Sequence, residues 1–292
     1  MADPLFLGYD REALDREYDN RRKVARTAEH LAWYARASEA ARRDLAPRLD
    51  VEVGPHPGER LDLFLPPPGA PRPTPVHAFI HGGYWQRMDK ADFSYVARPL
   101  VAAGAAVAVI NYDLMPAVRM AELVRQCRAA LAWLHRHAAS FGGDSTRLTV
   151  SGHSAGGHLV AMMLATDWPA FGAGLPADLV AAGCAISGLY DLEPIRLCYL
   201  NDVLGLTPDE ARAHSPALLA PPRPRPLAVV VGALEGPEYH RQVDALVAAW
   251  RPAGVPIEVI DLPGHDHFTI MASLEDPRAP LTRVILSQLG LA

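Results

Sequence analysis

The chain has few cysteines, no long apolar run and no block of like charge, and each absence argues against a class of protein or of partner. Its three cysteines, Cys127, Cys184 and Cys198, are odd in number and widely spaced along 292 residues. This usage is typical of buried, reduced thiols in a cytoplasmic protein and excludes a disulfide scaffold. None of the three lies on a turn motif, so a cysteine nucleophile is not favoured.

Signals for targeting and for charged partners are also missing. No apolar run reaches the roughly 20 residues that span a bilayer. Residues 1–8 have neither the basic start nor the apolar core of a secretory signal. The net charge is −5 and no basic stripe is present. The sequence therefore predicts a small-molecule substrate, with neither a nucleic acid nor a membrane as partner, and leaves a homodimer open.

What the chain does have is a series of short apolar runs separated by helical segments. We predict eight strands, at 51–53, 61–65, 76–80, 105–110, 147–151, 180–187, 227–231 and 257–261. The first two are predicted to form a β-hairpin. Helices are predicted at 95–102, 119–139, 154–166, 239–250 and 279–289. Apolar strands that alternate with helices indicate an α/β fold with a mostly parallel sheet covered on both faces.

The predicted organisation is a single α/β domain over residues 1–292. Half of the residues are hydrophobic, and chains of this length can form one large core. Residues 10–45 are charged, with interleaved apolar positions such as Leu14, Tyr18 and Leu31. One or two helices are expected there, so residues 1–48 are predicted to form a small N-terminal partial cap outside the sheet.

The most informative segment runs from Leu148 to His158. An apolar run leads into Gly152-His153-Ser154-Ala155-Gly156, and a helical stretch follows. This is the pattern of a nucleophile elbow, a tight strand-to-helix turn whose glycines avoid clashes that a Cβ would cause. The pattern predicts Ser154 as a nucleophile raised above the sheet, with the N–H of Ala155 directed toward an oxyanion.

A serine nucleophile also needs a second oxyanion donor, a base and an acid. In a parallel sheet such groups gather at the carboxyl ends of the strands. The segment His81-Gly82-Gly83-Tyr84-Trp85 directly follows the strand at 76–80. Its two glycines allow backbone N–H groups to turn toward Ser154, so Gly82 and Gly83 are predicted to complete the oxyanion hole.

Four side chains near these loops are assigned to the substrate pocket. They are His81, Tyr84, Trp85 and Tyr190. His81 is expected to orient its loop by hydrogen bonds and not to act as the base. For Tyr84 and Trp85, a position in the core or in a lid is an almost equally good interpretation.

The base and the acid each have two candidates. His267 and His265 both follow the last strand, where the base belongs in this chain order, and His267 is preferred because Phe268 can anchor it. Glu235 follows the strand at 227–231 and is the preferred acid, while Asp191 is its rival. Glu238 is assigned to the start of a helix.

A metal site is not predicted at His265-Asp266-His267. Alternating positions rarely converge on one ion, and no further ligand cluster is visible in the sequence. No cofactor is predicted either, because a serine, a base and an acid suffice for acyl transfer.

Five separated blocks resemble a known family. They are His81–Trp85, Gly152–Leu159, Ser187–Pro194, Val231–Gln242 and Asp266–Phe268. In this order they resemble the arylformamidase (kynurenine formamidase) branch of the α/β-hydrolase superfamily, from about residue 60 to the end. The resemblance implies the α/β-hydrolase fold and hydrolysis of N-formylkynurenine to kynurenine and formate in tryptophan breakdown.

The resemblance also implies roles for single residues. Ser154 would be the nucleophile, His267 the base and His81–Trp85 the oxyanion loop. Animal members of the branch carry aspartate where this chain has Glu235. Glutamate is one methylene longer and can still reach a histidine, as in other Ser-His-Glu hydrolases.

Two other functions compete with the formamidase. A carboxylesterase or amidase acting on another small aryl ester or carbamate would use the same groups. A non-catalytic binding protein on a hydrolase fold would typically have lost the serine or the histidine, and this chain retains both.

Overall fold

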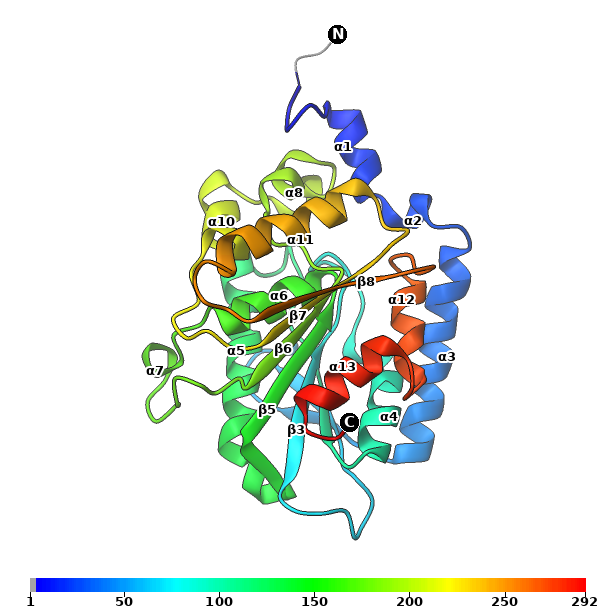
Figure 1. Ribbon diagram of the computed structural model, residues 1–292, viewed down its shortest axis with the longest axis vertical. Helices are drawn as coiled ribbons and strands as arrows, with labels where there is room; N and C mark the ends of the chain where they lie inside the picture. Colours follow the sequence, from blue (N-terminus) through cyan, green and yellow to red (C-terminus); the bar gives the residue numbers. More distant parts are fainter. Residues whose placement is uncertain (1–3) are drawn as a thin grey trace.

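The framework of the protein is one eight-stranded sheet, seen in the computed structural model of residues 4–292 (Figure 1). Residues 1–3, where the stretch expected to lack a secretory signal begins, lie outside the described residues. The strands are β1 (Arg48–Glu52), β2 (Arg60–Phe64), β3 (Thr74–Ile80), β4 (Ala106–Ile110), β5 (Gly143–His153), β6 (Ala182–Ile186), β7 (Leu227–Gly232) and β8 (Ile257–Leu262).

The strand order is β1-β2-β4-β3-β5-β6-β7-β8. β2 pairs antiparallel with β1 and β4, and every other neighbouring pair is parallel. The predicted hairpin and the mostly parallel sheet are thus confirmed. β3 and β5 begin earlier than predicted, because Thr74 pairs with Gly143 and Pro75 with Asp144 before the apolar part of either strand.

The helices of the described residues are α1 (Arg11–Tyr18), α2 (Asn20–Lys23), α3 (Thr27–Leu45), α4 (Ala97–Ala102), α5 (Met120–His137), α6 (Ala155–Leu164), α7 (Trp168–Phe171), α8 (Glu193–Leu197), α9 (Asn201–Leu204), α10 (Pro208–Ala213), α11 (Pro237–Trp250), α12 (Thr269–Ala272) and α13 (Pro280–Gln288). Among residues 4–292, no helix combines the length and the apolar character needed to cross a bilayer.

Helices cover both faces of the sheet, as predicted. Successive strand residues point to opposite faces, so Ala78 and Ile80 join one apolar cluster while Phe79 joins the other. The first cluster is closed by α5, α6 and α11, and the second by α3, α4, α12 and α13. Figure 1 shows these two groups on either side of the strands.

The N-terminal region contains three helices, where one or two were predicted. Asp10 accepts a hydrogen bond from the N–H of Ala13 and begins α1. Asp19 then leaves the helical conformation, with φ −84° and ψ 69°, and its side chain caps α2. An aspartate that caps the next helix therefore divides what looks like one periodic segment.

Five further helices, of four to six residues, were not predicted: α7, α8, α9, α10 and α12. Elements this short display too few turns for apolar periodicity. Capping signals could have located two of them. Asp167 caps α7, and Thr207 with Glu210 forms a capping box on α10.

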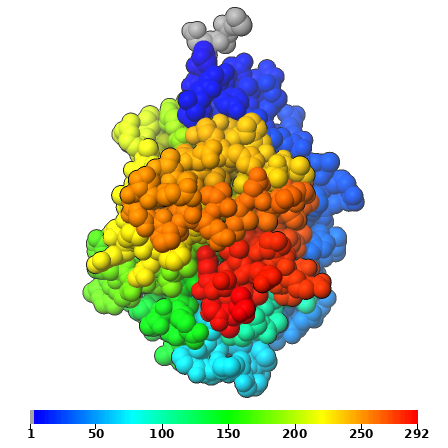
Figure 2. All heavy atoms as spheres, in the orientation of Figure 1, coloured from blue at the N-terminus to red at the C-terminus, as the bar shows by residue number. Residues whose placement is uncertain are grey.

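A buried hydroxyl fastens α1 to the body of the protein. Tyr18 donates a hydrogen bond of 2.7 Å to Glu238 Oε2 on α11 and accepts one of 3.0 Å from Gln242 Nε2. Glu238 also pairs with Arg241 at 2.9 Å. Figure 2 shows the blue N-terminal helices lying directly on the gold atoms of α11.

Tyr18→Phe is expected to lower the free energy of unfolding by about 1–3 kcal/mol, because it leaves a buried carboxylate oxygen without its hydroxyl donor. Urea unfolding measures the change. Tyr9→Phe is the matched control, since the Tyr9 hydroxyl makes no hydrogen bond within residues 4–292, and its effect should stay below about 0.5 kcal/mol. Equal midpoints for the two variants would contradict the role of Tyr18.

Candidate active site

Ser154 lies on a strained turn between β5 and α6. Its φ of +58° and ψ of −117° are rare for a residue with a side chain. The two flanking glycines allow this turn to approach β3. A Cβ on Gly152 would lie 2.5 Å from the carbonyl oxygen of Gly156, and one on Gly156 would lie 2.0 Å from that of Ile80. The predicted strand–turn–helix setting of Ser154 is therefore present.

His267 and Glu235 meet at the carboxyl ends of β8 and β7. His267 Nδ1 lies 2.7 Å from Glu235 Oε2, and the carboxylate is fully buried. Glu235 Oε1 accepts hydrogen bonds from Ser187 Oγ at 2.5 Å and from the N–H of Gly232 at 2.9 Å. Because a carboxylate only accepts, His267 Nδ1 donates this hydrogen bond, and Nε2 is the ring nitrogen not bonded to Glu235.

The rival acid is engaged by other partners, and no hydrogen bond within residues 4–292 joins the rival base His265 to Glu235. Asp191 Oδ2 pairs with Arg241 at 3.0 Å, and Asp191 Oδ1 accepts a hydrogen bond from the N–H of Glu193 at the start of α8. His265 meets the acid loop through its backbone, where its carbonyl accepts from the N–H of Leu234. The structure thus brings Glu235, and not Asp191, to His267.

Gly82 and Gly83 lie next to the elbow, as the sequence predicted. A Cβ on Gly82 would lie 3.1 Å from Ser154 Cβ. Gly83 has a φ of +112°, and a Cβ there would lie 2.1 Å from the carbonyl oxygen of Arg87. Ala155 is the first residue of α6, where a backbone N–H has no partner within the helix. The three predicted oxyanion donors are therefore on segments that converge at Ser154.

His81 is held in its own loop by stacking and by hydrogen bonds. Its ring stacks on Tyr112 with centroids 4.3 Å apart, and His81 Nε2 lies 3.1 Å from Asn111 Oδ1. Tyr112 donates a hydrogen bond to the carbonyl of His81. Burial lowers the pKa of His81 below its usual value, so the ring is neutral. These contacts agree with an orienting role.

Of the four residues assigned to the substrate pocket, one lines the cavity at Ser154. His81, Trp85 and Tyr190 are fully buried, and only Tyr84 lines the cavity at Ser154. Tyr84 and Trp85 both have positive φ, of 51° and 57°. The backbone therefore turns sharply at these two residues. The side chain of Trp85 lies in the core, where its Nε1 donates a hydrogen bond of 3.2 Å to His158 Nδ1.

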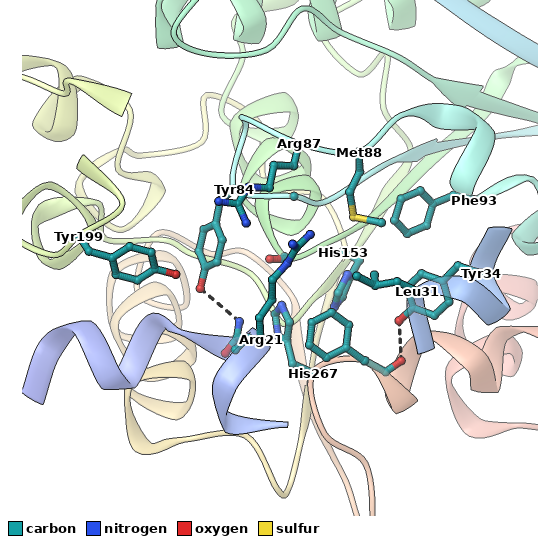
Figure 3. Close-up of a pocket in the computed structure, with 14 residues that line it drawn as sticks. Arg21, Leu31, Tyr34, Tyr84, Arg87, Met88, Phe93, His153, Tyr199 and His267 are labelled. Carbon is teal, nitrogen blue, oxygen red and sulfur yellow. Dashed lines mark hydrogen bonds between the residues drawn. The ribbon is translucent and has the colours of Figure 1, made fainter. Parts of the chain in front are cut away.

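The cavity at Ser154 has two contrasting halves (Figure 3). Its apolar half is lined by Leu31, Tyr34, Met88, Phe93 and Phe268. Its polar half is lined by Asn20, Arg21, Tyr84, Arg87 and Tyr199. Ser154, His153 and His267 also line the cavity. Most of these lining residues were missed, because isolated polar and aromatic positions in helices and loops carry no local sequence signal.

A chain of hydrogen bonds closes the polar half. Asn20 Nδ2 donates to the Tyr239 hydroxyl at 2.6 Å, and the Tyr239 and Tyr84 hydroxyls lie 2.9 Å apart. Tyr84 in turn donates to the carbonyl of Tyr18 at 2.8 Å. The Tyr239 ring also lies against His267, with centroids 4.8 Å apart. The N-terminal helices are thus bonded to Tyr239, whose ring contacts His267.

His153, the residue before Ser154, is held neutral. Burial and the neighbouring His267 lower its pKa well below the usual value. Its ring centroid lies 4.6 Å from that of His267. An uncharged His153 adds no positive charge beside the base. Across residues 4–292, no three His, Cys, Asp or Glu side chains are grouped to hold a metal ion.

Comparisons with known proteins agree with this geometry. The BD-FAE family model matches residues 61–169. The kynurenine formamidase of Danio rerio is 32% identical and covers 89% of this chain and 88% of its own length. That of Salmo salar is 31% identical, with the same coverage.

Solved structures extend the comparison. A candidate thioesterase from Silicibacter sp. tm1040 is 32% identical, with a TM-score of 0.80 over 93% of this chain and 98% of its own. An esterase of Pyrobaculum calidifontis is 18% identical, with a TM-score of 0.68 over 96% of this chain and 97% of its own. This similarity supports the fold and carries no statement about function.

Proposed function

From the premise that this chain belongs to the kynurenine formamidase family of α/β hydrolases, we propose that it converts N-formylkynurenine to kynurenine and formate in tryptophan breakdown. Ser154 is the nucleophile, His267 the base and Glu235 the acid that orients it. The observation that carries the proposal is the Glu235–His267 pair at the wall of the cavity that Ser154 also lines.

In the first half of the reaction, Ser154 Oγ attacks the formyl carbon, and His267 Nε2 accepts the proton of the Ser154 hydroxyl. Glu235 stabilises the imidazolium that forms. The N–H groups of Gly82, Gly83 and Ala155 stabilise the oxyanion, and each such donor contributes about 3 kcal/mol. His267 then protonates the aryl nitrogen, the C–N bond breaks, and a formyl ester remains on Ser154.

In the second half, water replaces the aryl amine. His267 removes a proton from the water, which attacks the formyl ester and forms a second tetrahedral intermediate. Its collapse returns the proton to Ser154 and releases formate. The apolar half of the cavity, with Phe93 and Phe268, supports an aryl ring on the leaving group.

A carboxylesterase or thioesterase activity is the second candidate, favoured by the related candidate thioesterase and by the same catalytic geometry. We expect kcat/KM for N-formylkynurenine to exceed that for phenyl acetate and for an aryl thioester by at least about 10-fold. Steady-state rates on these three substrates measure the preference. A higher value for either ester would reject the formamidase in favour of the second candidate.

We also propose that the protein works in the cytoplasm. Cys127, Cys184 and Cys198 are free and buried. Burial raises the pKa of the Cys184 and Cys198 thiols to about 12. Thiols of this kind are inert and suit a reducing compartment.

A further inference from the structure

Two arginines in the polar half of the cavity have no partner of their own. Arg21 on α2 and Arg87 on the oxyanion loop both line the cavity and are exposed. Within residues 4–292, neither guanidinium makes an ion pair or a hydrogen bond. Neighbouring arginines differ, since Arg11 pairs with Asp15 and Arg16 with Glu12.

The charge of the cavity contrasts with that of the whole protein. The chain carries a net charge of −5, yet none of the aspartates and glutamates among residues 4–292 lines the cavity at Ser154. Glu235 is buried and pairs with His267. Two guanidinium groups without a counterion produce a local positive potential, which attracts an anion.

The backbones that carry the two arginines are fixed. Arg21 follows Asn20, whose side chain is held by Tyr239 at 2.6 Å. Arg87 belongs to the loop in which Gly83 packs against the Arg87 carbonyl. Figure 3 shows both side chains extending over the cavity, beside Tyr84. Guanidinium groups arranged in this way suit a carboxylate, which they bind through paired N–H donors.

We propose that Arg21 and Arg87 form a subsite for a carboxylate on the leaving group of the substrate. The proposal rests on the proposed function and sharpens it, because it specifies an aryl formamide whose amine product is an anion-bearing amino acid. The aryl ring would occupy the apolar half, and the carboxylate would reach across Ser154 to the polar half. The two arginines would therefore distinguish this substrate from neutral aryl formamides and esters.

The test compares N-formylkynurenine with the analogue that lacks only its carboxylate. For the wild-type protein we expect a clear preference for the carboxylate. Arg21→Ala/Arg87→Ala should lower kcat/KM for N-formylkynurenine by about 100-fold, mainly through KM, because charged hydrogen bonds to the substrate are lost. For the decarboxylated analogue the loss should be at most about 5-fold.

Arg22→Ala/Arg36→Ala is the matched control. Both positions are exposed, neither lines the cavity at Ser154, and the variant removes the same charge. We expect it to leave kcat/KM for both substrates near the wild-type values. Equal losses for the two substrates in the Arg21/Arg87 variant, or no loss for either, would overturn the subsite. Circular dichroism melting confirms that each variant is folded.

Failure of the proposed function gives a different result. If the wild-type protein hydrolyses no formamide, the proposed formamidase function is rejected. The same variants are then assayed on phenyl acetate and on a phenyl acetate that carries a propionate group ortho to the ester. Loss of a preference for the carboxylate ester in the Arg21/Arg87 variant would still support the subsite. An unchanged ratio of the two rates would reject it independently.

Discussion

Ser154→Ala is expected to lower kcat for aryl formamides and for p-nitrophenyl esters by about 10⁴-fold or more, with little change in KM. The variant removes the only atom that can form the acyl-enzyme in the proposed reaction. Substrate contacts remain, because the methyl group of alanine fits wherever the serine side chain fits. Stopped-flow detection of a burst of p-nitrophenol in the wild type, and its absence in the variant, would establish the covalent step.

Ser151→Ala is the matched control for this result. Ser151 lies three residues earlier in the chain, on β5, and its Oγ contacts His77 Nε2 at 2.7 Å in the core. Its removal affects packing and not the site, so kcat should stay within about 3-fold of the wild type. Normal turnover in Ser154→Ala would show that another group attacks the substrate.

Glu235→Gln is expected to lower kcat by about 10³- to 10⁴-fold. Glu235 Oε1 accepts two hydrogen bonds, from Ser187 and Gly232. A glutamine must keep its oxygen at that position, because an NH₂ group would oppose the backbone N–H. Its NH₂ group therefore faces His267 Nδ1 and donates to it, so the proton of the ring moves to Nε2. A protonated Nε2 can no longer accept the proton of Ser154.

Asp191→Asn provides an isosteric control for Glu235→Gln. It changes a carboxylate of the other candidate acid, which pairs with Arg241 at 3.0 Å and does not contact His267. We expect kcat within about 3-fold of the wild type and a loss of stability of about 1 kcal/mol. If Asp191→Asn abolished turnover and Glu235→Gln did not, Asp191 would be the acid.

Much of the fold and the centre of the site could be predicted from the sequence because their signals are local. The apolar runs of β3, β4, β6 and β7 are continuous, and the sheet buries them on both faces. Gly152 and Gly156 mark a turn that only glycine permits. Ser154, His267 and Glu235 then follow strand ends, where the order of the sheet brings them together.

The rest of the site depends on tertiary contacts that the sequence does not display. Whether Tyr84 or Trp85 faces the cavity is decided by two consecutive positive φ angles. Arg21 resembles its neighbours Arg22 and Lys23 in sequence, and only its place over the cavity distinguishes it. The cap lies outside the blocks that resemble the family, so its residues could be found only in the structure.

The attachment of α1 and α2 has a consequence for the synthesis of the protein. Tyr18 and Asn20 leave the ribosome before their partners Glu238 and Tyr239, which lie 220 and 219 residues later in the chain. Translation proceeds at about 5–20 residues per second, so about 10–45 s pass before the residues that bind the N-terminal helices have been synthesised. During translation the polar half of the cavity therefore stays incomplete until α11 has been synthesised, because Asn20 and Tyr84 have no Tyr239 hydroxyl to bind before then.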